Sequence, residues 1–551
     1  MRTRRLAVLL FAVIPAAGAQ TLFHNGHVRT LDSAQPQAQA MLVDADGRIQ
    51  ALGSDADLLP QHAGAARHDL DGAQVLPGLI DAHGHLAGLG SALLSADLVG
   101  ADSKEEIIRR LRAFAGKLPE GAWITGRGWD QNRWPQPEFP GAADLDAAFP
   151  DTPVWLRRVD GHAGWANSAA LRQVTRNLDG DWQPDGGRIL RDSVGQASGV
   201  FIDSAMELVN QALPTPDHAL RRRALELAVA EAARHGLTGV HDAGVDLDTL
   251  ALMRELADAG RLPIRIYAMA DGDGATLDWL CDNGRYAHPS GRLQMRAVKL
   301  YMDGALGSRG AALLRDYADE PGNRGLLVTP VDRLNATIAK AGRCGIQVAT
   351  HAIGDRGNRL VLDAYAALPE AGRAARRARI EHAQIVHPDD IARFAAQQVI
   401  ASMQPVHATS DMPWAQARVG RQRLRGAYAW QRFAAHDTRM AFGSDFPVEA
   451  VNPFHGLHAA VTRQDADGQP EGGWLPAQRL DLDAALHGFT LGAAWAGFAE
   501  DEVGSLSPGK RADFIVVDRD VFAASPAQLR ASVVRSSWLD GKQVYPASTA
   551  Q

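Results

Sequence analysis

Short apolar runs alternate with amphipathic stretches through the middle of this 551-residue chain. In the stretches between the runs, apolar residues recur at helical spacing, as over residues 220–233 and 331–341. Strands that alternate with helices in this way predict a parallel α/β architecture. The runs that we expect to form the parallel strands cover residues 75–80, 236–241, 263–268, 295–301, 346–350, 379–381, 399–403 and 440–443.

Eight strands of this kind predict a closed (β/α)8 TIM barrel, which we place at residues 75–499. An open, doubly wound sheet is the alternative. The sequence gives that alternative little support, because no Gly-x-Gly-x-x-Gly turn follows an early strand.

Both ends of the chain show a different pattern, in which apolar and polar residues alternate over short stretches as in half-buried strands. Near the N-terminus these are residues 21–30 and 40–52, with Asp46-Gly47 as a hairpin turn. Near the C-terminus they are residues 509–518 and 533–545, with Asp540-Gly541 as the turn. We therefore predict one small, discontinuous β-sandwich domain built from residues 20–74 and 500–551.

A long segment, residues 91–215, interrupts the alternation after the first barrel strand. The segment is rich in Trp, Gly and Pro. A structureless loop of this length is implausible inside a compact domain. We therefore predict an insertion subdomain that lies over the mouth of the barrel.

Residues 1–19 are typical of a secretory signal peptide. Arg2, Arg4 and Arg5 form a basic start, residues 6–14 are apolar, and Ala17-Gly18-Ala19 fits a cleavage site. An uncleaved anchor and a wrongly assigned start codon are the alternatives. The apolar stretch is too short to span a bilayer, and no later stretch approaches that length. We expect export across the inner membrane to a bacterial periplasm, with no stable membrane insertion after cleavage.

The net charge of the chain bears on which partners it can bind. The formal charge of −7 becomes −10 once the three arginines of the signal are removed, and no basic patch interleaved with aromatic residues is present. Both observations argue against nucleic acid as a partner.

The chain has two cysteines, Cys281 and Cys344. They could pair in an oxidising compartment, but two cysteines do not make a disulfide framework, and we interpret both as packing residues.

Polar residues that can bind metal follow several of the predicted strands. His83 and His85 end the first strand, and their period-two spacing places both imidazoles on one side. Two neutral imidazoles can chelate a metal ion of borderline softness, such as zinc. In a barrel the strand ends converge on one face, where the active site lies. Further polar residues at the ends of later strands are Lys299, His351, His382 and Asp445.

This ordered set resembles the metal-dependent amidohydrolase superfamily. The narrower resemblance is to the amidohydrolase-3, or YtcJ-like, family, which includes N-substituted formamide deformylases. It rests on Val-Lys-Leu-Tyr-Met-Asp-Gly at 298–304, Thr-His-Ala-Ile-Gly-Asp at 350–355, Arg-Ile-Glu-His at 379–382 and Phe-Gly-Ser-Asp-Phe-Pro at 442–447. The resemblance extends from about residue 24 to residue 545. It implies metal-dependent hydrolysis of a non-peptide, amide-type C–N bond in a small-molecule substrate.

The resemblance also implies two divalent metal ions, for which we expect zinc, although Mn, Fe and Co suit the same ligands. One ion would be held by His83, His85 and Asp445, and the second by His351 and His382. Metal-activated hydroxide would then attack the substrate, and Asp445 would pass the proton of that water to the leaving amine.

Lys299 needs a modification to take part in such a centre. As an ammonium it has no lone pair and cannot ligate a cation. The resemblance implies N6-carboxylation, which makes Lys299 an anionic carbamate that bridges the two ions. An unmodified Lys299 that binds substrate beside a single metal is the alternative.

Other residues are candidates for substrate binding rather than metal ligation. His162 could stabilise an oxyanion or could pack within its turn, and Trp129 could line the pocket or belong to a core. Asp303 and Arg309 could pair with each other behind the ligands. The full set is Arg127, Trp129, Asp160, His162, Asp303, Arg309 and Gln404.

Three other functions compete with amide hydrolysis. One is deamination of a ring amine at a single metal ion. Related deaminases, however, carry a Glu a few residues after the histidine that corresponds to His351, where this chain has Gly354. Lactone, ester or phosphotriester hydrolysis on the same ligands is another. A catalytically inactive binding protein is the third, although such relatives typically lose ligands. A homodimer is compatible with the sequence.

Overall fold

The structure is a computed structural model that describes residues 20–119 and 121–546. The predicted signal peptide, residues 1–19, lies outside the described residues. Within them, none of the helices has both the length and the apolarity needed to cross a lipid bilayer.

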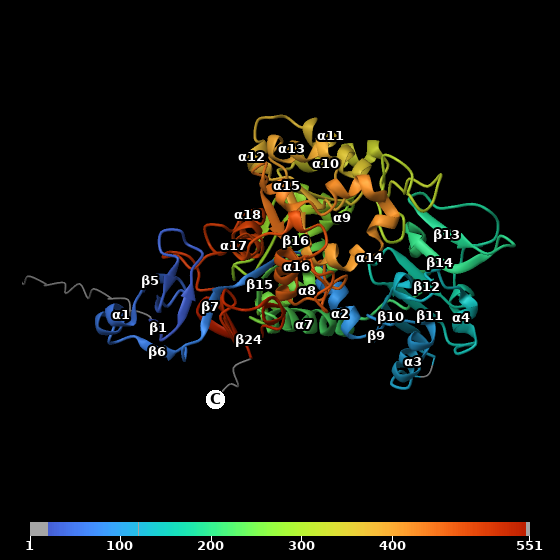
Figure 1. Cartoon of the computed structure of the whole chain (residues 1–551). Coiled ribbons are helices and arrows are strands. Elements are labelled where there is room, and N and C mark those ends of the chain that lie inside the picture. Colours follow the sequence, from blue (N-terminus) through green and yellow to red (C-terminus); the bar gives the residue numbers. More distant parts are fainter. Residues whose placement is uncertain (1–19, 120, 547–551) are drawn as a thin grey trace, which may run out of the picture.

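A nearly closed parallel barrel forms the centre of the molecule (Figure 1). Its strand order is β22-β21-β20-β19-β18-β16-β15-β8, with every pair in register as parallel neighbours. This confirms the predicted fold class. The strands are β8 (Leu79–Gly84), β15 (Leu237–Val245), β16 (Arg265–Asp271), β18 (Leu293–Tyr301), β19 (Gln347–Ala352), β20 (Arg379–His382), β21 (Ile400–Met403) and β22 (Met440–Phe442).

Helices cover the outside of the barrel, because their apolar faces pack on strands that are buried on both sides. β8 is followed by α2 (Leu86–Leu93). The later helices are α7 (His218–Arg234), α8 (Leu247–Asp258), α9 (Ala275–Asn283), α10 (Val331–Arg343), α11 (Asp355–Ala366), α13 (Pro388–Ala396), α14 (Pro405–Arg423) and α16 (Pro453–Thr462).

The first predicted barrel strand, residues 75–80, is two strands that belong to different sheets. β7 (Gln74–Pro77) pairs with β2 (His27–Arg29) and β23 (Phe514–Val517) outside the barrel, whereas β8 pairs with β15 inside it. The change occurs at Gly78, whose amide donates to Asp513 O at 2.9 Å, while Leu79 N donates to Gly236 O at 3.3 Å. A side chain at position 78 would collide with Thr238, since a Cβ there would lie 2.1 Å from its Oγ1. One continuous apolar run therefore supplies two sheets.

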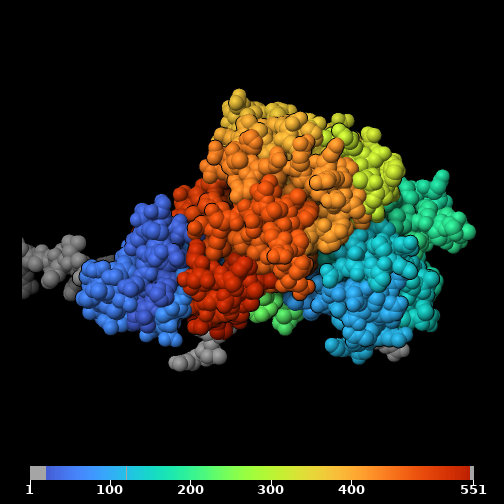
Figure 2. Space-filling model, viewed as in Figure 1, coloured from blue at the N-terminus to red at the C-terminus, as the bar shows by residue number. Residues whose placement is uncertain are grey.

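Both chain ends contribute to one pair of sheets beside the barrel. The four-stranded sheet has the order β5-β4-β1-β6 and the six-stranded sheet the order β25-β24-β23-β7-β2-β3. Figure 2 shows the N-terminal segment, in blue, lying against the C-terminal segment, in red. The remaining strands are β1 (Thr21–His24), β2 (His27–Arg29), β3 (Gln37–Ala38), β4 (Ala40–Val43), β5 (Ile49–Gly53), β6 (Ala66–Asp69), β23 (Phe514–Val517), β24 (Val534–Leu539) and β25 (Lys542–Tyr545).

The segment after α2 folds around its own core, at the end of the molecule opposite the terminal sheets (Figures 1 and 2). It contains a six-stranded sheet of order β13-β14-β12-β11-β10-β9. The strands are β9 (Ala96–Asp97), β10 (Ile124–Trp129), β11 (Val154–Arg158), β12 (Ala163–Ala166), β13 (Gly187–Arg191) and β14 (Ala197–Asp203), and the main helix is α3 (Lys104–Ala115).

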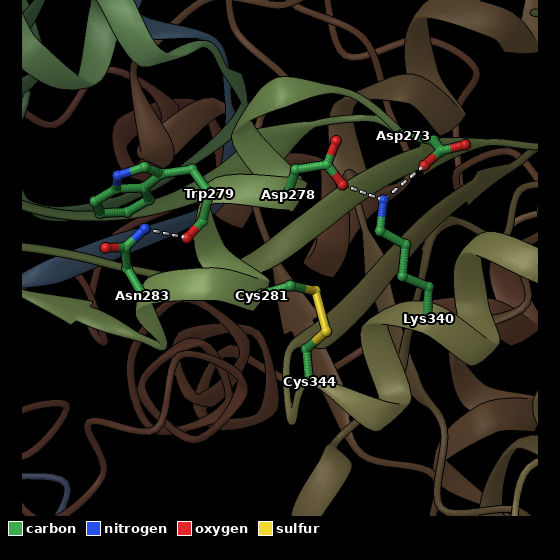
Figure 3. Close-up of a disulfide and its surroundings, with 7 residues drawn as sticks. All are labelled: Asp273, Asp278, Trp279, Cys281, Asn283, Lys340 and Cys344. Atoms are coloured by element: carbon green, nitrogen blue, oxygen red, sulfur yellow. Dashed lines mark hydrogen bonds and ion pairs between the residues drawn. A yellow bond between two sulfur atoms is a disulfide. The ribbon is translucent and has the colours of Figure 1, made fainter.

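Cys281 and Cys344 form a disulfide, which corrects their interpretation as packing residues (Figure 3). Cys281 lies on α9 and Cys344 directly follows α10, two helices that stand next to each other because β18 lies between β16 and β19 in the barrel. Lys340 of α10 also donates to Asp278 of α9 at 2.5 Å. The two cysteines can pair because α9 and α10 are adjacent in the fold, and the number of cysteines alone does not reveal this.

We predict that replacing both cysteines, in Cys281→Ser/Cys344→Ser, lowers the free energy of unfolding by about 2–4 kcal/mol, because the crosslink closes a loop over a sequence separation of 63 residues. Chemical denaturation of the exported protein, with and without reductant, measures the change. Thiol titration of the denatured wild type should find no free cysteine, and two free thiols would contradict the pairing.

Candidate metal centre

The carboxyl ends of the barrel strands gather the six residues expected to bind metal. His83 lies within β8 and His85 directly after it, His351 lies in β19, and His382 ends β20. Lys299 lies in β18, and Asp445 follows β22. All except His85 are buried. The single face of a barrel thus brings together residues from opposite ends of the sequence, as predicted from strand ends alone.

The carboxylate of Asp445 is the hub of this cluster. Its Oδ1 lies 3.0 Å from His85 Nε2 and 3.6 Å from His83 Nε2. Its Oδ2 lies 4.0 Å from His382 Nδ1 and 3.8 Å from His407 Nε2. Two groups of possible ligand atoms therefore share Asp445, one with His83 and His85 and one with His382 and His407.

Two residues of the cluster have left-handed backbone conformations. His382 has φ of 77° and Asp445 has φ of 60°. A non-glycine residue at positive φ costs of order 1–3 kcal/mol and persists where the surroundings impose it, often at functional sites. His382 ends β20 and Asp445 follows β22, so the strained backbone conformations occur where the two strands reach the candidate site.

Hydrogen bonding sets the direction in which His83 presents its lone pair. Its Nδ1 donates to Glu381 Oε2 at 2.5 Å, so that Nε2 faces Lys299 Nζ at 3.1 Å. Burial, together with the charge of Lys299, lowers the pKa of His83 to about 4. The imidazole is therefore neutral at pH 7, as metal binding requires.

Glu381 is itself held by a buried arginine that sequence reasoning did not select. Arg379 Nε donates to Glu381 Oε1 at 2.8 Å, and both side chains are fully buried. Arg379 also donates to Ala82 O at 2.7 Å, to His241 Nδ1 at 2.9 Å and to Ser402 Oγ at 2.9 Å. Burial alone raises the pKa of Glu381, but Arg379 and His83 hold it well below its usual value. Glu381 is therefore an anion that orients His83.

Gln404 has a similar effect on His382 instead of facing substrate. Its Oε1 lies 2.8 Å from His382 Nδ1, and Gln404 is buried. An amide oxygen can only accept, so His382 Nδ1 carries the proton and Nε2 carries the lone pair.

His407 is a member of the cluster that sequence reasoning missed. It lies in the first turn of α14, three residues after Gln404 and after the end of β21. Both of its ring nitrogens are buried without a hydrogen-bond partner among the described residues, as are His351 Nε2 and Asp445 Oδ1. A divalent cation would satisfy buried nitrogens and oxygens that lack partners, and His407 lies in one group of possible ligand atoms with His382 and Asp445, so these residues fit a metal centre. His351 lies outside both groups, and its Nε2 is beside Asp303. The signal for His407 was its position just past a barrel strand.

Lys299 is the exception among the candidate ligands. Its ammonium makes no ion pair with any carboxylate in the described part of the chain; it lies beside His83 and 4.6 Å from the centre of the Tyr301 ring. Burial lowers the pKa of Lys299 to about 8. The unmodified amine does not match the donor set around it.

A cavity of about 940 Å³ opens onto the cluster between the insertion and the barrel. His351, His382, His407 and Asp445 border it from the barrel. The insertion contributes three of the residues predicted to contact substrate, Arg127, Asp160 and His162.

His162 and Asp160 follow β11 in a turn that faces the barrel. His162 Nδ1 lies 2.5 Å from Asp203 Oδ1, and its ring centre lies 5.2 Å from that of His351. Burial alone lowers the pKa of His162, but Asp203 raises it above its usual value. Asp160 pairs with Arg158 at 2.5 Å and accepts from the amide of His162. Asp160 therefore shapes the turn, and His162 keeps Nε2 available to the cavity.

Four of the predicted substrate residues do not border the cavity: Gln404, described above, and Trp129, Asp303 and Arg309. Trp129 is fully buried in the core of the insertion and donates to Leu156 O at 2.9 Å. Arg309 does not pair with Asp303; it binds Asp319 at 3.0 Å and Glu320 at 3.2 Å. The carboxylate of Asp303 is buried behind His351, 3.6 Å from its Nε2, and accepts three backbone amides, those of Ala312, Ile353 and Gly354.

Comparison with known proteins agrees with the resemblance read from the sequence. The model of the Amidohydrolase family matches residues 68–545. Protein LONG AFTER FAR-RED 3 of Arabidopsis thaliana is 34% identical over 98% of this chain and 94% of its own. The N-substituted formamide deformylase of Arthrobacter pascens is 29% identical over 95% of this chain and 97% of its own. A metal-dependent hydrolase from Pyrococcus horikoshii superimposes with a TM-score of 0.75, with 29% identity over 92% of this chain and 99% of its own.

We predict that Glu381→Gln weakens metal binding by about 10- to 100-fold, because the neutral amide no longer fixes the tautomer of His83 and leaves Arg379 without its anion. Chelator competition followed by metal analysis measures the change. Ser402→Ala is the matched control, since it also removes a partner of Arg379 but does not touch His83. Equal metal affinity in Glu381→Gln and wild type would refute the orienting role.

Proposed function

The chain belongs to the amidohydrolase family and is a metal-dependent hydrolase, and from this premise we propose that it hydrolyses an amide-type, non-peptide C–N bond of a small molecule with two divalent ions. The observation that carries the proposal is the convergence of neutral imidazoles, the anionic Asp445 and the unpaired Lys299 at one end of the barrel. The similarity to an N-substituted formamide deformylase supports an amide as the substrate.

The proposed ligands divide into two sets around Asp445. His83 and His85 lie on its Oδ1 side and His382 on its Oδ2 side, with His351 beside His382 at 4.5 Å between ring centres. The mixed nitrogen and oxygen donors suit zinc. When bound, such ions polarise a carbonyl and make a water molecule more acidic.

Carboxylation of Lys299 would remove the mismatch between its charge and its surroundings. The ammonium first loses one proton, and the neutral amine then adds to CO2, forming an N–C bond and releasing a second proton, so that a cation becomes an anion. The carbamate supplies two oxygens from the side of His83, where Nζ now lies 3.1 Å from Nε2. Burial without a carboxylate partner favours this change, because it disfavours the ammonium.

Two residues of the chain would handle the proton and the developing charge. Asp445 borders the cavity as a carboxylate, because its contacts with His85 and the other histidines hold its pKa well below the usual value although burial raises it. It would take a proton from the attacking water and pass it to the leaving nitrogen as the C–N bond breaks. His162 would donate from Nε2 to the oxygen of the tetrahedral intermediate, held in place by Asp203. The products are a carboxylic acid and an amine.

We also propose that the protein acts after export, in a periplasm. The predicted signal peptide motivates this, and the Cys281–Cys344 disulfide supports it, because such crosslinks persist in oxidising compartments and are rare in reducing cytoplasm.

The mature protein should contain about two metal ions per chain, and Lys299→Ala should fall toward one or none, since the bridging anion is lost. Inductively coupled plasma mass spectrometry on both proteins measures this. Arg309→Ala is the control, because Arg309 pairs with Asp319 outside the cavity and should leave the metal content unchanged. One ion per chain, unaffected by the Lys299 substitution, would instead indicate a mononuclear site.

Hydrolysis of N-alkylformamides and N-acetylamines tests the bond proposed to be cleaved. We expect release of amine and acid by the metal-loaded wild type, and a loss of about 10²- to 10⁴-fold in kcat for Asp445→Asn, which cannot accept the proton. Metal content is measured in the same samples to separate chemistry from ligand loss. Turnover of lactones with none of the amides would contradict the C–N assignment.

A further inference from the structure

Three of the arginines that border the cavity, Arg127, Arg133 and Arg530, form no ion pair within the described residues, and of these only Arg127 is held by side-chain hydrogen bonds to described residues. Arg127, on β10, donates from Nη2 to Val159 O at 2.9 Å and from Nε to Pro447 O at 3.4 Å. Its Nη1 makes no hydrogen bond to any described residue, and Arg127 forms no ion pair in the described part of the chain. Two backbone oxygens hold the group in place but do not neutralise it.

The charges around Arg127 differ from those around the other arginines of the insertion. Arg158 also borders the cavity, but its guanidinium is neutralised by Asp130 and Asp160. Arg157 lies directly opposite Arg127 in the parallel pairing of β10 with β11, so a second cation stands on the adjacent strand. Arg127 therefore has no ion-pair partner among the described residues, although the charges of Asp160 and Asp445 act on it from a distance.

Arg127 is also close to the proposed chemistry. Pro447, which it contacts, is two residues after Asp445, and Val159 is three residues before His162. Gly161 has φ of +77°, and a Cβ there would lie 3.4 Å from Nη1 of Arg127. The absence of a side chain at position 161 leaves that side of the guanidinium uncovered.

Four acidic residues of the cavity bear on this charge. Asp160 and Asp445 act on Arg127 through space but have other partners, Arg158 and His85. The remaining two are Asp411 and Glu449. Asp411 accepts from Tyr428 Oη at 2.5 Å and from Gln384 Nε2 at 3.0 Å, and Glu449 accepts from Ser410 Oγ at 2.5 Å. Burial raises the pKa of Asp411 to about 7 and that of Glu449 to about 8, so much of their charge is absent at neutral pH.

Exposed apolar side chains border part of the cavity. Leu93 is 46% exposed and Val99 is 56% exposed, although large apolar side chains are usually covered. Both border the cavity together with Leu89 and Trp414. A ligand that reaches from this part of the cavity to Arg127 would therefore place an apolar group against these side chains.

We propose that Arg127 binds a carboxylate of the substrate, and that the substrate class is a small amide carrying both a carboxylate and an apolar group; this rests on the amide hydrolysis proposed above. The planar fork of an arginine matches a carboxylate and gives short, charge-assisted hydrogen bonds. Nη1 is free to make such a bond, while the bonds to Val159 and Pro447 keep the fork oriented toward the cavity.

Binding tests this site independently of turnover. Calorimetric titration with 4-methylpentanoate and with 4-methylpentan-1-ol, which share a carbon skeleton and differ in charge, is carried out on the metal-loaded wild type, Arg127→Met, Arg127→Lys and Arg133→Met. Arg133 is an exposed arginine that also borders the cavity and serves as the control. We expect the preference for the carboxylate to fall about 10- to 100-fold in Arg127→Met only, with partial retention in Arg127→Lys.

The ratio of the two affinities within each variant is the readout, because a general disturbance of the cavity weakens both ligands alike. An unchanged ratio in Arg127→Met overturns the proposal and indicates that the carboxylate binds elsewhere, for example at the metal ions. An equal fall in Arg133→Met overturns it as well, since a diffuse positive potential would then explain the preference.

Hydrolysis of racemic N-formylleucine and of its carboxamide separates this inference from the proposed function. Cleavage of the acid with about tenfold higher kcat/KM than the carboxamide, lost in Arg127→Met, supports both. Equal cleavage of the two by wild type, with no differential effect of Arg127→Met, overturns the carboxylate site and leaves the hydrolase intact. Failure of wild type to cleave either compound counts against amide hydrolysis, while the binding ratio still decides on Arg127.

Discussion

The structure depends on the contact that closes the barrel between its first and last strands. Asp81, in β8, accepts from the amide of His83, from the amide of Ser444 and from Ser444 Oγ at distances of 2.6–3.1 Å. Asp445 N then donates to His83 O at 2.7 Å. Gly443 is required at this contact, because a Cβ there would lie 2.3 Å from Asp81 Oδ1. The contact that joins the first and last strands of the barrel therefore also positions His83 and Asp445 of the candidate metal centre.

Charge compensation inside the barrel extends from that contact. One buried cation, Arg379, is neutralised by Glu381, which in turn orients His83, so the tautomer of this candidate ligand depends on an arginine that acts through Glu381. Such a buried pair is costly to break, because removal of either partner leaves an uncompensated charge in a low-dielectric interior. Lys299 is the buried cation of the barrel that no carboxylate neutralises within the described residues.

The insertion gives the family's common barrel its own cavity. The insertion presents Arg127 and His162 to the cavity, and Trp129, Trp134 and Trp165 pack against one another in its core. In the function that we propose, the barrel provides the hydrolytic groups and the insertion provides groups that select the substrate, as is common when loops and insertions at a barrel mouth carry specificity.

Strand and helix periodicity, the turns Asp46-Gly47 and Asp540-Gly541, and the ordered polar residues at strand ends were enough to predict the barrel and the six residues that the structure gathers. Local patterns determine these features because burial on both faces of a strand demands a continuous apolar run. The same logic failed at Gly78, where one such run serves two sheets, since apolarity does not say which partner a strand meets. It also failed for His407, Glu381, Gln404, Arg309 and the disulfide. Each of those depends on which side chains lie within a few ångströms across the closed barrel or between adjacent helices, and only the tertiary structure decides such distances.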